Sequence, residues 1–475
     1  MIPHMSKRFR TCDLNQPFLF PPSLQDWLPE RHLARFVADV TDQLDLIRIY
    51  ADYGRKDGRG LAAYHPLMMV RLLLYGYCVG IVSSRKIEQK TFDDVAFRFL
   101  AAGEHPDHDS IANFRQRHLL PLAELFTQAL KLCGKAGLIK LGHVAIDGTK
   151  LKANASKHKA MSYERMNEKE KQLREEVDKL LAEAAKADAD EDAKYGPGKR
   201  IDELPKELAR RESRLKKIAA AKAQLEQEAR ERAEAEKAAV EARLEQRRQQ
   251  EQEQGRKISG RRPQVPEPEQ AKPEPTAQRN FTDADSRIML DGATKEFVQG
   301  YNAQAAVDSA AQIIVAAEIT QQVNDKKQLV PMMQAVEKNL GQKPEHVTAD
   351  AGYFSEQAVT DPVVNGVDVL VAVSREKHGQ GEQTDKEVAK QGEPKEPSVA
   401  ETMREKLSGA AGKAIYKMRK AVVEPVFGQI KERRGLRRFL LRGLEKVSAE
   451  WKIICLTHNL LKLFQAGVCA QAVKI

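Results

Sequence analysis

The chain has 475 residues, which predicts about three domains at roughly 150 residues each. Its net charge of +10 favours an acidic partner such as nucleic acid over a neutral metabolite. Five scattered cysteines without a CxxC pair argue against a disulfide framework or a structural zinc site, and favour a reduced, cytoplasmic protein. We expect no secretory signal and no membrane span, because the most apolar stretch, 66–81, carries Arg71 and is too short.

The first part of the chain is predicted to be helical. Residues 1–29 form an N-terminal arm in this prediction, and residues 30–140 form an all-α domain. Its first helix has apolar residues at the i, i+3, i+4 spacing of an amphipathic helix, namely Leu33, Phe36, Val37, Val40 and Leu44. Further helices are predicted at 66–79, 83–90, 91–101, 109–119 and 121–136.

The middle of the chain is predicted to be a long insertion. Residues 141–159 contain a β-prone run that ends in Asp-Gly, a turn signal. Residues 160–255 consist almost wholly of Ala, Glu, Lys, Arg, Gln and Leu, a composition that predicts a helical hairpin or coiled coil. Arg211 and Lys222 interrupt its apolar stripe. The Pro/Glu-rich segment 256–280 predicts a disordered linker.

The last part of the chain returns to strands. Within 281–440, β-branched and alternating segments are separated by helical ones, which predicts an α/β domain with a mixed sheet. The helical insertion interrupts this domain after its first strand. Residues 441–475 are predicted to form a C-terminal amphipathic helix and a tail.

Three acidic residues lie where a metal site would need them. Asp147 and Asp350 each end a β-prone run, VAID and VTAD, and Glu424 lies on a predicted helix. Carboxylates at strand ends can converge with one from a helix on Mg²⁺, which prefers oxygen ligands. Two such ions activate the attacking oxygen and stabilise the leaving oxygen in phosphodiester displacement. An Asp-Gly turn without any metal role is the alternative.

A basic cluster surrounds the glutamate. Ten Lys and Arg residues lie between 413 and 442, and the acidic residues among them are Glu424 and Glu432. Lys431 follows Glu424 by seven residues, two helical turns, which predicts that both face the same way. Such a cluster fits a site that binds metal next to a polyanion. A solvated basic helix is the alternative.

Several sequence blocks together resemble the bacterial insertion-sequence transposases of the DDE class. The resemblance runs over nearly the whole chain and is weakest at 1–25, 185–275 and 376–405. The blocks that carry it include PDHDSIANFR, AIDGTKLKANASKHKAMSYERM, GYNAQAAVD, ADAGYF and VEPVFGQIKERRGLRRFLLRGLEKV. The resemblance implies an RNase H-like catalytic domain with an InsH-type helical N-terminal domain.

For the site, the resemblance implies that Asp147, Asp350 and Glu424 bind two Mg²⁺ or Mn²⁺ ions. Related transposases often show a Tyr-x2-Arg-x3-Glu-x6-Lys pattern. Lys431 fits that pattern as a phosphate contact, whereas Tyr416 and Arg419 each lie one residue too early.

Some polar residues have open roles. Asp285 is expected to hold a loop, although a contribution to the metal site stays open. Asn302 and Gln304 alternate on a strand, where contact with DNA and solvation at a sheet edge are both open.

The predicted function is a DNA transposase that cuts element ends and transfers the freed strand into target DNA. Its partners would be double-stranded DNA and further copies of the chain, in the cytoplasm at the nucleoid and away from any membrane. Two alternatives stay open: an RNase H-like nuclease without strand transfer, and an inactive, domesticated DNA-binding protein.

DNA binding is predicted to be divided between two regions. The helical region 30–140 would recognise element ends. The basic cluster would hold phosphates without reading sequence, through Arg433, Arg434, Arg437 and Arg438. For Arg115 and Arg117 in the helical region, DNA contact and ordinary surface charge are both open.

Overall fold

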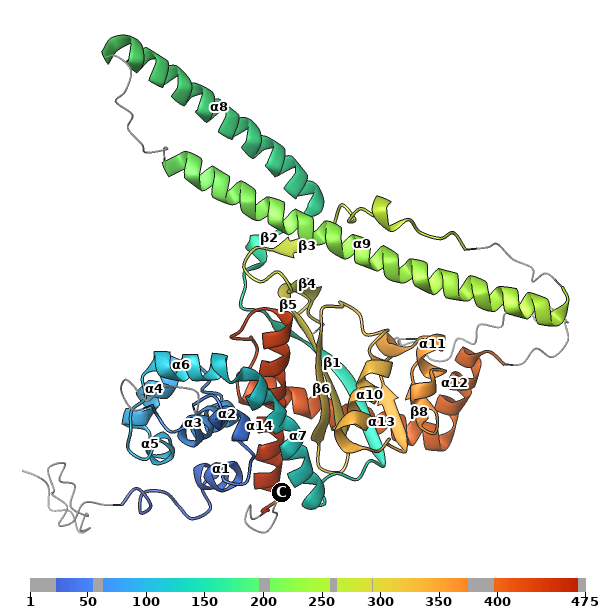
Figure 1. Cartoon of the computed structure of the whole chain (residues 1–475). Helices are drawn as coiled ribbons and strands as arrows, with labels where there is room; N and C mark the ends of the chain where they lie inside the picture. The colour runs from blue at the N-terminus through green and yellow to red at the C-terminus, as the bar shows by residue number, and fades with distance from the viewer. Residues whose placement is uncertain are drawn as a thin grey trace, which may run out of the picture.

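A computed structural model describes residues 23–53, 63–195, 206–256, 263–292, 294–374 and 397–468. A mixed β-sheet lies at its centre, with a group of helices on one side and a pair of long helices projecting away (Figure 1). The predicted N-terminal arm lies mostly outside the described residues.

The N-terminal region is helical, as predicted, and the predicted helices are present within a few residues of their expected ends. Pro66 lies in the first turn of one helix, where its missing N–H costs nothing, and Gly80 ends that helix with a left-handed φ of 80°. The helices are α1 (Leu33–Thr41), α2 (Ile47–Tyr50), α3 (Pro66–Val79), α4 (Ser84–Asp93), α5 (Val95–Leu100), α6 (His108–Arg117) and α7 (Leu119–Lys135).

The apolar helix α3 is a core helix. Most of its residues are buried inside the protein. Within the described ranges, no single helix has both the length and the apolar character needed to cross a membrane. Helices α3 and α4 meet that requirement only as a pair, and they are bent by 97° at the break between them.

The sheet has the mixed topology that the sequence predicts. Strand β5 lies antiparallel to β1 on one edge and to β4 and β6 on the other, while β1, β7 and β8 run parallel. The strands of this sheet are β1 (His143–Lys152), β4 (Arg287–Leu290), β5 (Phe297–Asp308), β6 (Ile313–Thr320), β7 (His346–Ala349) and β8 (Asp368–Val371).

Helices and short turns of the second half of the chain surround this sheet. A π-helical turn, η5 (Gln429–Arg433), directly follows α13 and departs from the regular α-helix expected there. The helices are α10 (Leu329–Leu340), α11 (Glu356–Val359), α12 (Val399–Ser408), α13 (Ala410–Gly428) and α14 (Leu444–Gln465). The 3₁₀ turns are η1 (Lys157–Lys159), η2 (Pro268–Gln270), η3 (Ala351–Tyr353) and η4 (Pro362–Val364).

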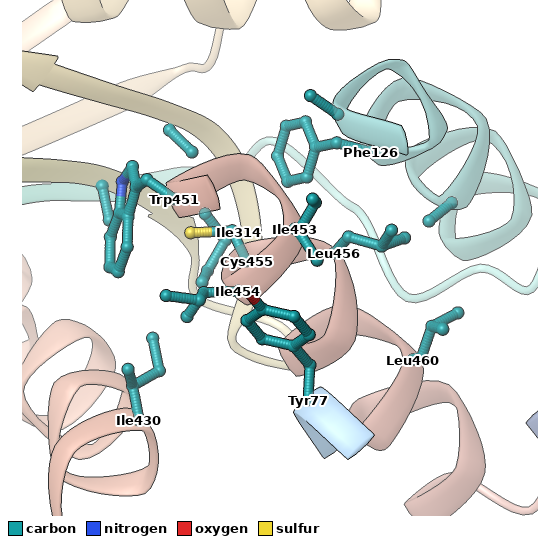
Figure 2. Packing of buried hydrophobic residues seen from close by; sticks show 14 of the residues in the cluster. Tyr77, Phe126, Ile314, Ile430, Trp451, Ile453, Ile454, Cys455, Leu456 and Leu460 are labelled. Atoms are coloured by element: carbon teal, nitrogen blue, oxygen red, sulfur yellow. The ribbon is translucent and has the colours of Figure 1, made fainter. Parts of the chain in front are cut away.

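Helix α14 joins the two halves of the protein into one hydrophobic core. It packs against α7, α3 and β6. In Figure 2 its side chains lie between Tyr77 of α3, Phe126 of α7 and Ile314 of β6. One core cluster therefore joins the N-terminal helices, the sheet and α14, while α8 and α9 share a separate, smaller cluster. The predicted boundaries at 140 and 441 separate stretches of sequence, but they do not separate hydrophobic cores.

The insertion consists of two long helices, α8 (Tyr163–Tyr195) and α9 (Lys206–Gln254), which lie side by side in opposite directions near their base (Figure 1). The two cations that interrupt the apolar stripe form ion pairs between the helices. Arg211 lies 2.8 Å from Glu176, and Lys222 lies 3.2 Å from Glu170. Two paired helices thus lie within the predicted insertion. That it forms a regular coiled coil stays a prediction.

The predicted disordered linker is partly ordered. Its residues 278–280 form β3 (Gln278–Asn280), which pairs antiparallel with β2 (Ala160–Ser162) at the base of the hairpin. The carbonyls of Ala277 and Pro275 accept hydrogen bonds from the first N–H groups of α8, at 2.8 and 3.2 Å. These N–H groups have no partner within their own helix. The prediction of disorder over 256–280 was therefore wrong for this part.

Candidate catalytic centre

Two of the three predicted acids lie together at the ends of neighbouring strands. Ile146 of β1 pairs with Ala349 of β7, so the next residues, Asp147 and Asp350, lie side by side. One oxygen of each carboxylate is fixed by a main-chain N–H at 2.8 Å, from Gly148 for Asp147 and from Gly352 for Asp350. Of the two remaining oxygens, Oδ2 of Asp147 faces the guanidinium of Arg419.

The charge of this pair is only partly balanced. The pKa of Asp147 is raised to about 7, first by burial and then by the negative charge of Asp350. Arg419 of α13, itself buried, opposes this shift, with its Nη1 3.5 Å from Asp147 Oδ2. Its Nε has no hydrogen-bond partner among the described residues. A site that crowds negative charge in this way fits a bound cation.

The third predicted acid is not part of this pair. Glu424 lies on α13, is exposed to solvent, and has no ion-pair partner among the described residues. It follows Arg419 by five residues, which turns its side chain about 140° around the helix from the one that contacts Asp147. Among the described residues no three His, Cys, Asp or Glu side chains are close enough together to hold a metal ion. Two carboxylates thus fit a metal, and a third is not in coordinating position.

A further acidic residue, which no sequence pattern marks, lies next to the pair. Asp325 follows β6, and its Oδ1 accepts hydrogen bonds from Asn302 Nδ2 at 2.6 Å and Gln304 Nε2 at 2.8 Å. Its charge raises the pKa of Asp147. The amides that hold it are fully buried on the inner strand β5, so the sheet-edge alternative for them was wrong.

Two glycines leave the space that these carboxylates occupy. A Cβ on Gly148 would lie 2.3 Å from Gln304 Nε2 and 3.0 Å from Asp325 Oδ1. A Cβ on Gly352 would lie 2.9 Å from Asp350 Oδ1 and 3.7 Å from Asp325 Oδ2. Asp325 therefore lies beside both strand ends. Nothing in its local sequence, VNDKK, distinguishes it from other acidic loop residues.

Two families match the chain. The family described as Transposase DDE domain matches residues 275–460, and the family described as Transposase domain (DUF772) matches residues 22–117. The chain belongs to the DDE transposases of insertion sequences. No curated protein and no solved structure matches it.

The matches fit the architecture of this transposase. The DDE match includes Asp350 and Glu424, whereas Asp147 lies between the two matched stretches. Strand β1, which carries Asp147, nevertheless lies inside the sheet formed by the matched strands. The mixed sheet is consistent with the RNase H-like fold that a DDE domain implies. Enzymes of this family cut and transpose DNA and depend on divalent metal ions.

Two arginines are buried in the transposase: Arg434, which we predict to contact DNA, and Arg115, for which DNA contact and surface charge are both open. Arg434 is 6% exposed and donates to Thr457 Oγ1 at 2.9 Å, inside the contact between η5, α3 and α14. Arg115 is 7% exposed and donates to the carbonyl of Val82 at 2.8 Å. Neither guanidinium reaches the surface, so both are withdrawn as DNA contacts.

The other predicted contacts are placed differently. Arg433, Arg437 and Arg438 are exposed, and Arg437 forms an ion pair with Glu432. Arg117 lies 3.4 Å from Asp52. The roles of these arginines in DNA binding stay predictions.

Two further candidates are Tyr416 and Lys431. The guanidinium of Arg419, which contacts Asp147, lies 5.9 Å from the centroid of the Tyr416 ring, and a role of Tyr416 in the site stays a prediction. Lys431 lies in the π-helical turn, where the argument from two regular α-helical turns no longer applies. The pKa of Lys431 is lowered by burial, an effect that the nearby Asp291 opposes.

Asp285 has a role in the fold. Its Oδ2 accepts a hydrogen bond from the N–H of Leu444 at 2.9 Å, at the first turn of α14. Gln321 Nε2 donates to its carbonyl at 2.9 Å. These contacts agree with the expectation that it holds a loop.

Proposed function

We propose that this transposase cuts the phosphodiester bonds at element ends, and transfers the freed 3′-hydroxyl to target DNA, at the centre formed by Asp147 and Asp350. The main support is the position of two carboxylates at adjacent strand ends, where burial and mutual repulsion raise the pKa of Asp147 to about 7. A divalent cation, which prefers oxygen ligands, would offset the repulsion between carboxylates placed in this way.

Two Mg²⁺ or Mn²⁺ ions would supply Lewis-acid activation of the attacking oxygen and stabilisation of the leaving oxygen. Asp147 and Asp350 would hold these ions through their carboxylates, each of which the main-chain N–H of a glycine fixes in place. Arg419 would keep the Asp147 carboxylate in one orientation. Lys150, whose Nζ lies 3.9 Å from Asp325, would remain beside the carboxylates as a neighbouring positive charge.

Two residues compete for the role of third metal ligand. The family resemblance favours Glu424, which would have to turn toward the aspartates when DNA and metal bind. The position of Asp325 between Gly148 and Gly352 favours Asp325 instead. We propose Glu424 as the third ligand and Asp325 as the residue that fixes Asn302 and Gln304 beneath the site.

The direct test replaces each strand-end aspartate with its amide. Asp147→Asn and Asp350→Asn should bind element-end DNA as the wild type does and should not cut it. The assay follows a labelled duplex with the element end, supplied with Mg²⁺ and a target plasmid. It scores cut ends and joined products separately. Cutting at the wild-type rate by either variant would refute the assignment.

The same assay separates the alternatives. A nuclease without strand transfer would give cut ends and no joined products, even from a pre-cut end with a free 3′-hydroxyl. An inactive DNA-binding protein would give neither product while still retaining the duplex. No observation on this chain favours either alternative.

We further propose a setting for this activity. Residues 30–140 would recognise element ends, and two or more copies of the chain would hold a pair of ends together at the nucleoid in the cytoplasm. Because both ends must be cut before the element can move, a pair of active sites is the simplest arrangement. The molecular mass of the complex with element-end duplexes, measured by light scattering, tests this arrangement.

A further inference from the structure

An open cleft of about 550 Å³ lies beyond the catalytic aspartates, where the end of β1 meets the segment 438–442 and the start of β5. Five cations line it, and all five are exposed to solvent. They are Lys152, Lys157, Lys159, Arg438 and Arg442. Of these, only Arg438 was predicted from the sequence as a contact for DNA.

The charge of this cleft is not neutralised by the protein. None of the five cations forms an ion pair with another described residue, and Glu296 is the single acid among the described lining residues. The one side-chain hydrogen bond among the cations runs from Arg442 Nε to the carbonyl of Asn154, at 2.9 Å, and leaves the positive charge unbalanced. Cations held together without counter-charges favour an anionic ligand.

The backbone under the cleft is fixed by hydrogen bonds. The N–H of Lys152 donates to the carbonyl of Arg437 at 3.1 Å, and the N–H of Phe439 donates to the carbonyl of Lys152 at 2.9 Å. Asn154 Nδ2 donates to the carbonyl of Leu440 at 2.6 Å. The cations therefore project from a platform that does not need to be ordered when a ligand binds, which lowers the cost of binding.

The shape of the cleft argues for an extended anion. Small-molecule sites are concave and mostly apolar, with a few polar groups that converge on the ligand. Here the cations lie on two separate stretches of the chain, 152–159 and 438–442, around an open cleft. Such a distribution suits the regularly spaced phosphates of a nucleic acid backbone.

The cleft and the catalytic centre share strand β1. Lys152 follows Asp147 by five residues, which places it about 16 Å further along the strand at a rise of roughly 3.3 Å per residue. Five nucleotides of one DNA strand make about half a helical turn, which would turn the phosphate to the opposite face of the duplex, so a contact about 16 Å away on the same face lies closer than that. We infer that the cleft binds the backbone of the DNA duplex a few nucleotides, less than half a helical turn, from the bond that is cut. This inference rests on the proposed function.

The test compares two charge-matched triple variants. Lys152→Gln, Lys159→Gln and Arg438→Gln together remove three charges from the cleft. Their main-chain hydrogen bonds remain, because those use backbone atoms. The control variant carries Lys338→Gln, Arg404→Gln and Lys446→Gln, which remove three exposed cations outside the cleft, outside residues 30–140 and outside the basic cluster 413–442. Equal melting temperatures of both variants and the wild type establish that the fold is intact.

Binding of a labelled element-end duplex is then measured at several salt concentrations. Each phosphate contact contributes about 0.9 to the slope of log affinity against log salt, so the cleft variant should lower that slope by about 2.7. The control variant should keep the wild-type slope. An unchanged slope in the cleft variant, or an equal loss in both variants, would overturn the inference.

A second measurement locates the contact on the DNA. Neutral methylphosphonate linkages are placed one at a time along the duplex. Those about two to four nucleotides from the cut should weaken binding by the wild type, and should have little further effect on the cleft variant. Sensitivity confined to the phosphates next to the cut would refute the assigned position.

Failure of the proposed function would look different. In that case the wild type itself would leave the duplex uncut and unjoined. If the wild type cuts and joins while the cleft variant binds with an unchanged salt slope, only the cleft assignment fails. Asp147→Asn, which should bind DNA with the wild-type salt slope, separates binding from cutting.

Discussion

At the scale of single residues, Asp147 makes the stability of the folded protein depend on pH. Its folded pKa of about 7 lies above the ordinary value of 3.8, so the folded state binds more protons than the unfolded state between these values. The contribution is fully present below pH 3.8 and is lost as the pH rises through 7. In Asp147→Asn the group stays neutral and this loss is absent.

The predicted outcome is a pH-dependent difference between wild type and Asp147→Asn in metal-free buffer. The free energy of unfolding of the variant, relative to wild type, should rise between pH 4 and pH 8 by at most about 4 kcal/mol. Because the carboxyl of Asp147 is partly exposed, we expect the rise in the free energy of unfolding to be smaller than this limit. Urea unfolding of the variant and the wild type at pH 4 and pH 8 measures this difference in the free energy of unfolding. A difference that does not change with pH would mean that the carboxyl is solvated like an ordinary one.

The competing third ligands can be separated by their amide variants. Glu424→Gln should lower the cleavage rate by more than about 100-fold, because even residues that only orient metal ligands cost roughly 10–100-fold when lost. Asp325→Asn should lower the cleavage rate by only roughly 10–100-fold, as expected for a residue that orients the site. Single-turnover cleavage at saturating Mg²⁺ gives both values. The reverse order would assign metal binding to Asp325 and a lesser role to Glu424.

The sequence could predict the aspartate pair but not its surroundings. Asp147 and Asp350 end β-prone runs, and parallel neighbouring strands bring such residues together. Asp325 depends on how the loop after β6 returns to the sheet, which no local pattern encodes. The basic cluster likewise could not reveal that Arg434 faces inward, because an arginine has the same charge in a sequence whether its side chain is buried or exposed.

At the scale of elements, Arg434 joins η5 to α3 and α14. Arg434→Met should lower the free energy of unfolding by about 3 kcal/mol. The substitution removes a buried guanidinium, and the carbonyl of Ile454 and the hydroxyl of Thr457 lose the hydrogen bonds that it donates. The exposed neighbour Arg433→Met should change stability by less than about 0.5 kcal/mol. Chemical denaturation measures both. Similar losses in the two variants would contradict the buried role of Arg434.

The long helical pair should be removable from the catalytic fold. Ser162 pairs with Gln278 at the end of β2 and β3, so replacing 163–277 with Asn-Gly should convert the base into a tight β-hairpin. The shortened protein should still fold and gain stability from Mg²⁺. We expect it to lose assembly of paired DNA ends, since the projecting helices are placed to contact DNA or a second copy. Calorimetry and light scattering measure these properties. Loss of folding would mean that the insertion belongs to the core.

Helices were easier to predict than the linker. Apolar spacing and end signals such as Pro66 and Gly80 are local, so the helix limits follow from the sequence. The Pro/Glu composition of 256–280 suggested disorder, but its carbonyls cap the first turn of α8. That contact forms between residues more than a hundred positions apart. Composition alone could not predict it.

At the scale of the whole molecule, the helical region and the sheet share one core through α14. A fragment of residues 23–140 should therefore fail to form a fixed tertiary structure, because the face of α7 that α14 covers would be exposed. Near-ultraviolet circular dichroism and binding of a hydrophobic dye should show this, with the full chain as control. A fragment with sharp tertiary signals would show that the N-terminal region folds as an independent domain.

The arrangement of α14 also has a consequence for the synthesis of the protein. Chains generally fold from the N-terminus as they leave the ribosome. Here the N-terminal helices cannot complete their packing until α14 has been synthesised, and α14 is translated after every strand of the sheet. A premature stop or frameshift upstream of α14 therefore removes the support of the earliest helices as well as the end of the chain. Truncated gene copies should yield unfolded chains and not free DNA-binding fragments that would compete with the intact enzyme.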